Sequence, residues 1–384
     1  MKPFFRSLAL IFLLATLAGI AGAFAYTALF PKLVTWPLTA GIPWPTPLSN
    51  STTIIERTEQ VVLSPEEGIE RFIPGPRTSV VSIVSTFSGR TTRAVNVNPM
   101  QSVMSGVLLT NDGLIATYAT ERPVSENRDF TVLFADGQNS KAAFVAFDEV
   151  VNIAYYRTER SDTASIAFAN SNDIRPGRRY IAIAGTSTGE GERVAAGVIS
   201  EYSRTFNLSG KTVASSDKWE GAFFLDRALG RDFSGGTVVA MNGELIGLIG
   251  TTTLDGRETV FVLPSNTIRR SLERLSRLVT DAPRQTFGAY YLSITPAVMQ
   301  SFGLSHDRGA YIYTPSEKTG LAVIAGSLAE RLGLRYGDIV LSVNNQEINL
   351  DRPLSVALDD VLPGESLRLQ IERSGKPLEL QATR

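Results

Sequence analysis

Ser234 is the residue whose immediate neighbours best suit covalent chemistry. It is followed by Gly235 and Gly236, which permit a tight backbone turn, and Asp232 lies two positions before it. A serine hydroxyl attacks poorly near neutral pH unless an adjacent base takes its proton. Histidine is the usual base, and the chain has a single histidine, His306, far downstream. The sequence therefore contains a candidate nucleophile with no histidine near it in the chain.

Other kinds of chemistry find little support in the composition. The chain of 384 residues has no cysteine and a formal net charge of −1, so neither a thiolate site nor a nucleic-acid surface is expected. Histidine and acidic residues do not occur at metal-ligand spacing, and no glycine-rich phosphate loop is found. We therefore expect no cofactor and no metal. Lys211 and Lys218 are alternative bases, but their polar loop offers no apolar setting that would favour a neutral amine.

Short apolar or alternating runs, separated by turn residues, fill the stretch that must position Ser234. Residues 106–109 and 114–117 flank an Asn-Asp-Gly turn at 111–113, which predicts a hairpin. Many strands at this spacing argue for an all-β barrel or sandwich pair, not for alternating strands and helices. Residues 267–278 then predict an amphipathic helix that closes the domain.

A second, smaller domain is expected after Pro283. Ser327 is a candidate N-cap of a short helix, with Glu330 at the capping-box position and Gly333 as its stop. The other elements expected here are strands at 309–313 and 337–344, a helix near 354–361 and a hairpin turning at 374–375.

The N-terminus carries a long apolar run. No charged residue lies between Arg6 and Lys32, and a helix of this length, rising about 1.5 Å per residue, spans a hydrocarbon core of roughly 30 Å. Lys2 and Arg6 precede the run, so we expect an uncleaved transmembrane anchor with its N-terminus in the cytoplasm. The alternative is a cleaved signal peptide, because residues 23–25 resemble an A-x-A site.

Two groups of motifs resemble the HtrA/Deg family of serine proteases. The first comprises residues 105–109, 111–113 and the serine turn at 233–236, and the second is a PDZ signature over residues 326–340. The resemblance covers nearly the whole folded part and implies an all-β trypsin-like double β-barrel followed by a small α+β PDZ domain. The domains it implies are a tip and transmembrane anchor over 1–32, a proline-rich linker over 33–64, the protease fold over 65–282 and the PDZ domain over 284–384.

The resemblance also implies positions for a catalytic triad, which needs a nucleophile, an imidazole base and a carboxylate that orients it. Ser234 occupies the nucleophile position, but Thr120 stands at the histidine position and Asn152 at the aspartate position. Asp232 replaces a glycine whose backbone helps to form the oxyanion hole, and its charge opposes a developing oxyanion. Because neither threonine nor asparagine acts as a base near neutral pH, these departures predict an inactive site.

The PDZ resemblance implies a peptide-binding strand. PDZ domains add an extended peptide beside a strand, next to a loop whose amides hold the terminal carboxylate. The matching loop is placed at residues 288–292, with Tyr291 where the family has glycine. We expect Tyr290, Tyr291, Leu292 and Ile294 to contact the peptide. The alternative is a domain that only packs against the barrel.

Together these features predict a membrane-anchored HtrA-like pseudoprotease in the periplasm. Its expected partners are extended peptides or unfolded or membrane-protein segments, and it would form a homotrimer or a mixed assembly with an active relative. Two alternatives stay open: an active serine endopeptidase with an atypical site that uses Ser234, and a structural envelope protein that uses neither site. Only the first alternative expects covalent labelling of Ser234.

Overall fold

The computed structural model divides into two compact units, residues 1–62 and 63–384. The smaller unit contains helix α1 (Lys2–Phe24) and the π-helix η1 (Ala25–Leu29). In the part of the chain that the structure describes, no helix is long and apolar enough to cross a membrane. The linker expected at 33–64 lies outside that part. The described residues are 2–29, 72–87, 103–123, 126, 128–186, 191–254, 256–279, 286–315 and 321–384.

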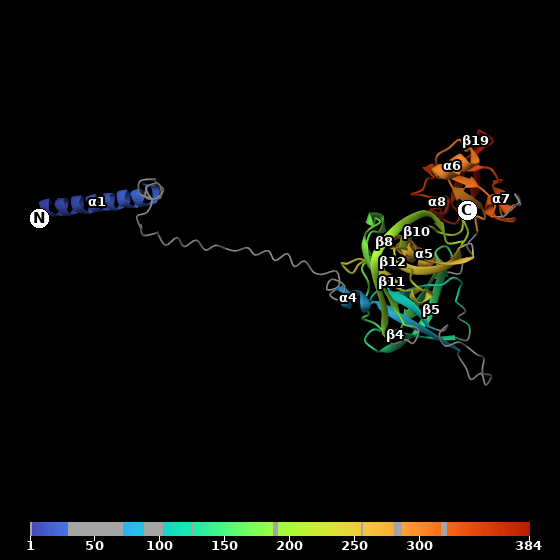
Figure 1. Ribbon diagram of the computed structural model, residues 1–384, viewed down its shortest axis with the longest axis horizontal. Coiled ribbons are helices and arrows are strands. Elements are labelled where there is room, and N and C mark those ends of the chain that lie inside the picture. The colour runs from blue at the N-terminus through green and yellow to red at the C-terminus, as the bar shows by residue number, and fades with distance from the viewer. Residues whose placement is uncertain are drawn as a thin grey trace. The chain divides into compact units, whose positions relative to one another are not determined.

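The described part of the larger unit begins with helix α4 (Pro74–Arg77) (Figure 1). A closed barrel of six strands follows, ordered β1-β2-β3-β6-β5-β4. The sequence builds it by alternation: in β4, Phe130, Val132 and Phe134 are buried, whereas the residues between them are more exposed. The predicted turn before β3 is confirmed, with Gly113 at a φ of 82°. The strands are β1 (Val80–Phe87), β2 (Val103–Leu108), β3 (Leu114–Tyr118), β4 (Arg128–Phe134), β5 (Asn139–Asp148) and β6 (Ile153–Thr158).

A second closed barrel follows, ordered β10-β13-β12-β11-β7-β8, so the all-β prediction is confirmed in its barrel form. The amphipathic helix predicted after it is α5 (Ser265–Val279), whose Ile268 is wholly buried. The other elements are the 3-10 helices η3 (Ser171–Asp173) and η4 (Arg231–Phe233), and the strands β7 (Arg179–Gly185), β8 (Glu192–Asn207), β10 (Glu220–Leu225), β11 (Thr237–Val239), β12 (Leu245–Leu254) and β13 (Arg257–Pro264).

The two barrels share one hydrophobic cluster, in which Tyr118 and Tyr155 of the first barrel meet Ile181, Leu248 and Phe261 of the second. The rings of Tyr118 and Phe261 pack edge to face at 5.5 Å between centroids. This contact holds β3 of the first barrel against β13 of the second, and the bend that carries Thr120 follows directly after β3.

The C-terminal part forms the predicted PDZ arrangement, a sheet ordered β19-β18-β16-β15-β14-β9 with β17 beside β16 (orange to red in Figure 1, apart from β9). The predicted N-cap is confirmed, because Ser327 Oγ accepts from the amide of Glu330 at 3.3 Å. The Glu330 carboxylate reaches back one residue further than in a capping box, to the amide of Gly326 at 2.6 Å. The elements are β14 (Tyr290–Ser293), α6 (Pro296–Phe302), β15 (Ala310–Ile312), α7 (Leu328–Arg331), β16 (Ile339–Val343), β17 (Gln346–Glu347), α8 (Leu354–Asp359), β18 (Ser366–Arg373) and β19 (Lys376–Thr383).

The last strand of that sheet, β9 (Ala214–Ser215), does not belong to the PDZ part of the sequence. It lies in the loop between β8 and β10 of the second barrel and pairs antiparallel with β14. A buried carboxylate next to it reinforces the joint: Glu220 accepts hydrogen bonds from the hydroxyls of Tyr291 and Ser293, the latter at 2.7 Å. The barrel and the PDZ part are thus joined through backbone pairing as well as side chains.

An arginine of the closing helix makes a second joint. Arg274 of α5 donates to Asp148 at 2.6 Å and also pairs with Asp359 of α8. Both carboxylates and the guanidinium are nearly removed from solvent, and Ser271 Oγ donates to the same oxygen of Asp148 at 2.7 Å. A buried ion pair of this kind fixes geometry, because removing one partner leaves the other charge uncompensated.

Glu220 gives the joint a predicted pH dependence. Burial raises the pKa of Glu220 from its usual 4.5 to about 7, although the hydrogen bonds from Tyr291 and Ser293 oppose the shift. Because the pKa of Glu220 is higher in the folded than in the unfolded protein, the protonated side chain stabilises the folded state. This stabilisation is complete below about pH 4.5 and is lost as the pH rises through about 7. We expect Glu220→Gln to flatten the dependence of the unfolding free energy on pH by ~2–3 kcal/mol between pH 5 and pH 8.

This prediction is checked by urea unfolding of the full-length protein at the two pH values. Glu201→Gln is the matched control, because Glu201 is an exposed glutamate of the same barrel. An identical pH slope for wild type and Glu220→Gln would show that Glu220 is already ionised in the folded protein.

Candidate functional site

The turn that carries Ser234 is tightly built. Ser234 follows the 3-10 helix η4, and its amide donates to the carbonyl of Arg231 at 2.9 Å. Gly235 has a φ of 79°, and a Cβ there would lie 2.2 Å from the carbonyl oxygen of Ser105 and 2.6 Å from Thr117 Oγ1. Glycine is therefore required at 235 both by the backbone angle and by the close approach to β2 and β3.

The same geometry affects the oxyanion position. In trypsin-like sites the amide of the nucleophilic serine is one of the donors to the developing oxyanion. Here that amide is already engaged within the turn, by Arg231. Asp232 pairs with Arg193 at 3.1 Å but keeps a side chain that is 46% exposed. The donor is occupied and a carboxylate lies nearby, so the turn as observed is poorly arranged to stabilise negative charge.

The structure brings the three expected triad positions to one region. The Ser234 turn packs on β3 through Gly235 and Thr117, and β3 leads directly to Thr120. The amide of Ala119 donates to the carbonyl of Asn152 at 2.9 Å, so the Thr120 bend lies beside Asn152. Thr120 itself is exposed. Its hydroxyl offers no proton acceptor of suitable basicity to Ser234.

Asn152 is held by partners of its own. It is 5% exposed and adopts a φ of 58°, a left-handed conformation that asparagine tolerates better than most residues. Its Oδ1 accepts from Lys218 Nζ at 2.9 Å and its Nδ2 donates to the Tyr118 hydroxyl at 3.2 Å. The carboxamide is therefore satisfied on both sides, and as a neutral group it would not stabilise an imidazolium.

Two neighbours of this site were not expected from the sequence. Tyr118 was not considered, and Lys218 was considered only as an alternative base. Burial raises the pKa of Tyr118 to about 12, so the hydroxyl stays protonated near neutral pH and cannot act as the base. Lys218 also donates to the carbonyl of Glu149 at 2.6 Å, a contact that only the folded loop creates. Ser234 Oγ accepts a long hydrogen bond of 3.4 Å from Thr251.

The only histidine of the chain lies in the PDZ part. His306 Nε2 is 2.9 Å from a carboxylate oxygen of Glu372, which belongs to β18. The side chain is 33% exposed in this pair. His306 is therefore a partly exposed loop residue that pairs with the PDZ sheet through Glu372.

The residues expected to bind a peptide are placed differently from the prediction. Tyr291 and Ile294 are buried, and β14 is paired on both edges, with β15 on one side and with β9 on the other. The hydroxyl of Tyr291 binds Glu220, so this side chain does not crowd the carboxylate-binding loop. Tyr290 and Leu292 are half-buried and alternate with Tyr291 along the strand.

The carboxylate-binding loop itself lies earlier than the sequence analysis placed it. The amides of Phe287 and Gly288 converge on the side-chain carboxylate of Asp217, at 2.7 and 2.9 Å. The amide of Ala289 donates to Ser216 Oγ at 3.0 Å. The signal for it was the aromatic-glycine-aliphatic triplet 287–289, in which the glycine is retained with a φ of 79°. The loop is intact, and placing Tyr291 at its glycine position was wrong.

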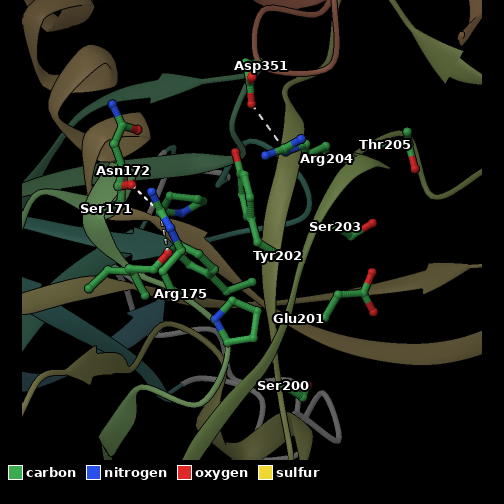
Figure 2. Close-up of a pocket in the computed structure, with 14 residues that line it drawn as sticks. Ser171, Asn172, Arg175, Ser200, Glu201, Tyr202, Ser203, Arg204, Thr205 and Asp351 are labelled. Atoms are coloured by element: carbon green, nitrogen blue, oxygen red, sulfur yellow. Dashed lines mark hydrogen bonds and ion pairs between the residues drawn. The ribbon is translucent and has the colours of Figure 1, made fainter. Parts of the chain in front are cut away.

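A pocket of about 780 Å³ lies beside β8, at another contact between barrel and PDZ part. Figure 2 shows Arg204 pointing toward Asp351, with which it pairs at 3.3 Å, while Tyr202 projects between them and Arg175. Residues 200–205 of β8, residues 171–176 and Asp351 line most of this pocket, and Ser234 does not line it. We assign it no chemistry.

Two protein families match this chain. The trypsin-like peptidase domain matches residues 104–248, and the PDZ domain matches residues 321–373. Among solved structures, the HtrA-type protease AlgW with a tripeptide aligns with a TM-score of 0.60 and 21% identity, over 82% of this chain and 95% of that one. At this identity the likeness concerns the fold.

Curated relatives are more similar in sequence. The periplasmic pH-dependent serine endoprotease DegQ of Escherichia coli (strain K12) is 27% identical over 291 residues, which cover 74% of this chain and 60% of DegQ. A probable periplasmic serine endoprotease DegP-like of Rhizobium meliloti (strain 1021) is 26% identical, over 71% of this chain and 51% of the relative. The chain thus spans little more than half the length of these relatives. With its two closed barrels and its PDZ sheet, the chain combines a trypsin-like peptidase domain with a PDZ domain and is similar to HtrA/Deg-like proteins.

Proposed function

We propose that this protein is a membrane-anchored HtrA-like pseudoprotease of the cell envelope that binds extended peptide segments through its PDZ domain. Residues 65–282 would form the protease-like scaffold and residues 284–384 the binding domain. The observation that carries the proposal is the position of the only histidine, which is paired with Glu372 in the PDZ sheet and so does not accompany Ser234. Without an imidazole, trypsin-like acyl transfer lacks its base.

Two further features support inactivity. The Ser234 amide is engaged by Arg231, and Asn152 is held between Tyr118 and Lys218. The Ser234 amide and the Asn152 side chain are thereby committed to other contacts. A single missing group already removes most of the rate in such sites, because the members act as a unit.

The peptide-binding role is supported by the carboxylate loop. The amides of residues 287–289 converge on oxygen acceptors, as a PDZ loop does around a terminal carboxylate. One solved structure of the HtrA-type protease AlgW is a complex with a decapeptide, and this chain shares that fold. The relatives DegQ and DegP-like are named periplasmic, which supports an envelope location for this protein as well.

Inactivity is tested by comparing the full-length protein with Ser234→Ala. We expect casein hydrolysis by the wild type to be no faster than that of the variant, and at least about four orders of magnitude below that of an active trypsin-like enzyme. A fluorophosphonate probe should leave Ser234 unlabelled. Serine-dependent turnover or labelling would instead support the alternative, an active endopeptidase with an atypical site.

Restoring chemistry should require more than the triad side chains. We expect Thr120→His with Asn152→Asp to remain unlabelled by the fluorophosphonate, because Asp232 still opposes the oxyanion and Lys218 is placed to pair with the new carboxylate. Adding Asp232→Gly should give measurable labelling, checked by mass spectrometry of the Ser234 peptide. Equal labelling of the double and triple variants would show that Asp232 has no influence on the reactivity of Ser234.

The anchor is tested by location. We propose that the apolar N-terminal segment holds the chain in the inner membrane with its N-terminus in the cytoplasm. The full-length protein should stay in the membrane fraction after a high-salt wash, and a reporter fused after Arg384 should be active outside the cytoplasm. A mature chain beginning near Ala25 or Tyr26 would identify the segment as a cleaved signal peptide.

A further inference from the structure

The edge of β14 that faces a peptide in a PDZ domain is occupied by this chain itself. Segment 214–217 runs antiparallel to β14, with Ala214 opposite Tyr291 and Ser215 opposite Tyr290. The amide of Ser216 then donates to the carbonyl of Ala289 at 2.9 Å. This direction and register place the C-terminal end of the segment against the carboxylate-binding loop, as for an added peptide strand.

Asp217 completes the likeness to a peptide terminus. Its Oδ1 accepts from the Phe287 amide and its Oδ2 from the Gly288 amide, while Ser216 Oγ serves the Ala289 amide. Successive backbone amides that converge in this way form a nest for an anion. The side-chain carboxylate of Asp217 thus binds the amides that would hold the terminal carboxylate of a peptide ending at Ser216.

The groove also restricts the size of what it holds. Ala214 is 3% exposed and belongs to the PDZ hydrophobic cluster with Tyr291, Leu354 and Ala357, so a small side chain fits this position. Upstream there is more room, because a cavity of about 430 Å³ beside the paired strands is lined by Thr212, Tyr291 and Leu292, among others. The occupied site therefore favours a peptide with a small residue third from its end.

We propose that segment 214–217 is an internal ligand of the PDZ groove, with Asp217 in the place of a C-terminal carboxylate. A peptide that ends in a free carboxylate, with small residues in its last three positions, binds the same site by displacing this segment. The inference rests on the proposed peptide-binding function. It adds the class of peptide that binds and the internal segment 214–217 with which that peptide competes. Because the internal segment is tethered, its effective concentration is high, and external peptides bind the wild type weakly.

The probe is a fluorescein-labelled peptide with the sequence of residues 211–216, Lys-Thr-Val-Ala-Ser-Ser, made with a free and with an amidated C-terminus. Binding to the full-length protein is measured by fluorescence anisotropy. Asp217→Asn removes the charge that the amides hold, so we expect the free-acid peptide to bind this variant at least about ten-fold more tightly than wild type. The amidated peptide should not gain. Asp129→Asn, at an exposed position of the first barrel, is the matched control and should behave as wild type.

A second variant and a second measurement guard against misfolding. Ser216→Ala removes the acceptor of the Ala289 amide and the hydroxyl that donates to Asp217 Oδ2 at 3.1 Å, but it keeps the Asp217 charge. It should therefore tighten peptide binding by a smaller factor. Hydrogen exchange at the amides of Phe287 and Gly288 should be faster in Asp217→Asn than in wild type. Equal peptide affinity in wild type, Asp217→Asn and Ser216→Ala would overturn the internal ligand and leave the peptide-binding function standing. No binding by any variant, with the amides exchanging faster, would overturn the peptide-binding function and with it the competition.

Discussion

The contact between the Asp217 carboxylate and the amides of Phe287 and Gly288 is the constraint around which the two folded parts are arranged. Buried backbone donors must find acceptors, and an open sheet edge presents a row of them. In this chain a loop of the second barrel supplies both the acceptor and the paired strand β9. The barrel and the PDZ part therefore close each other's polar edges, and Glu220 lies buried within the same joint.

The loop that reaches the PDZ groove also reaches Asn152, at the expected position of a triad carboxylate. Lys218 directly follows Asp217, and its ammonium binds the side chain of Asn152 and the carbonyl of Glu149. Trp219 continues the contact, since its amide donates to the carbonyl of Val150 at 2.9 Å. A short stretch of chain thus connects the groove to the position where a triad carboxylate is expected, through hydrogen bonds at consecutive residues.

Several polar groups of the protease-like region are satisfied by contacts within the fold. An unpaired buried polar group costs about 1–3 kcal/mol, so each such contact stabilises the folded state. Asn152 and Tyr118 bind each other, and Ser234 is held through its amide by Arg231. Asn152 and Ser234 are therefore held in place by hydrogen bonds that the fold itself supplies.

The sequence by itself determined the architecture, because the signals are local: the turn before β3, the alternation in β4, the amphipathic α5 and the N-cap at Ser327 all act within a few residues. The lack of a histidine near Ser234 in the chain also follows from composition alone. Only the tertiary structure decided that Asp217 fills the PDZ groove and that Tyr291 binds Glu220. The residues of these two pairs are 70 and 71 positions apart in the sequence. No local pattern encodes which distant carboxylate a loop amide will bind.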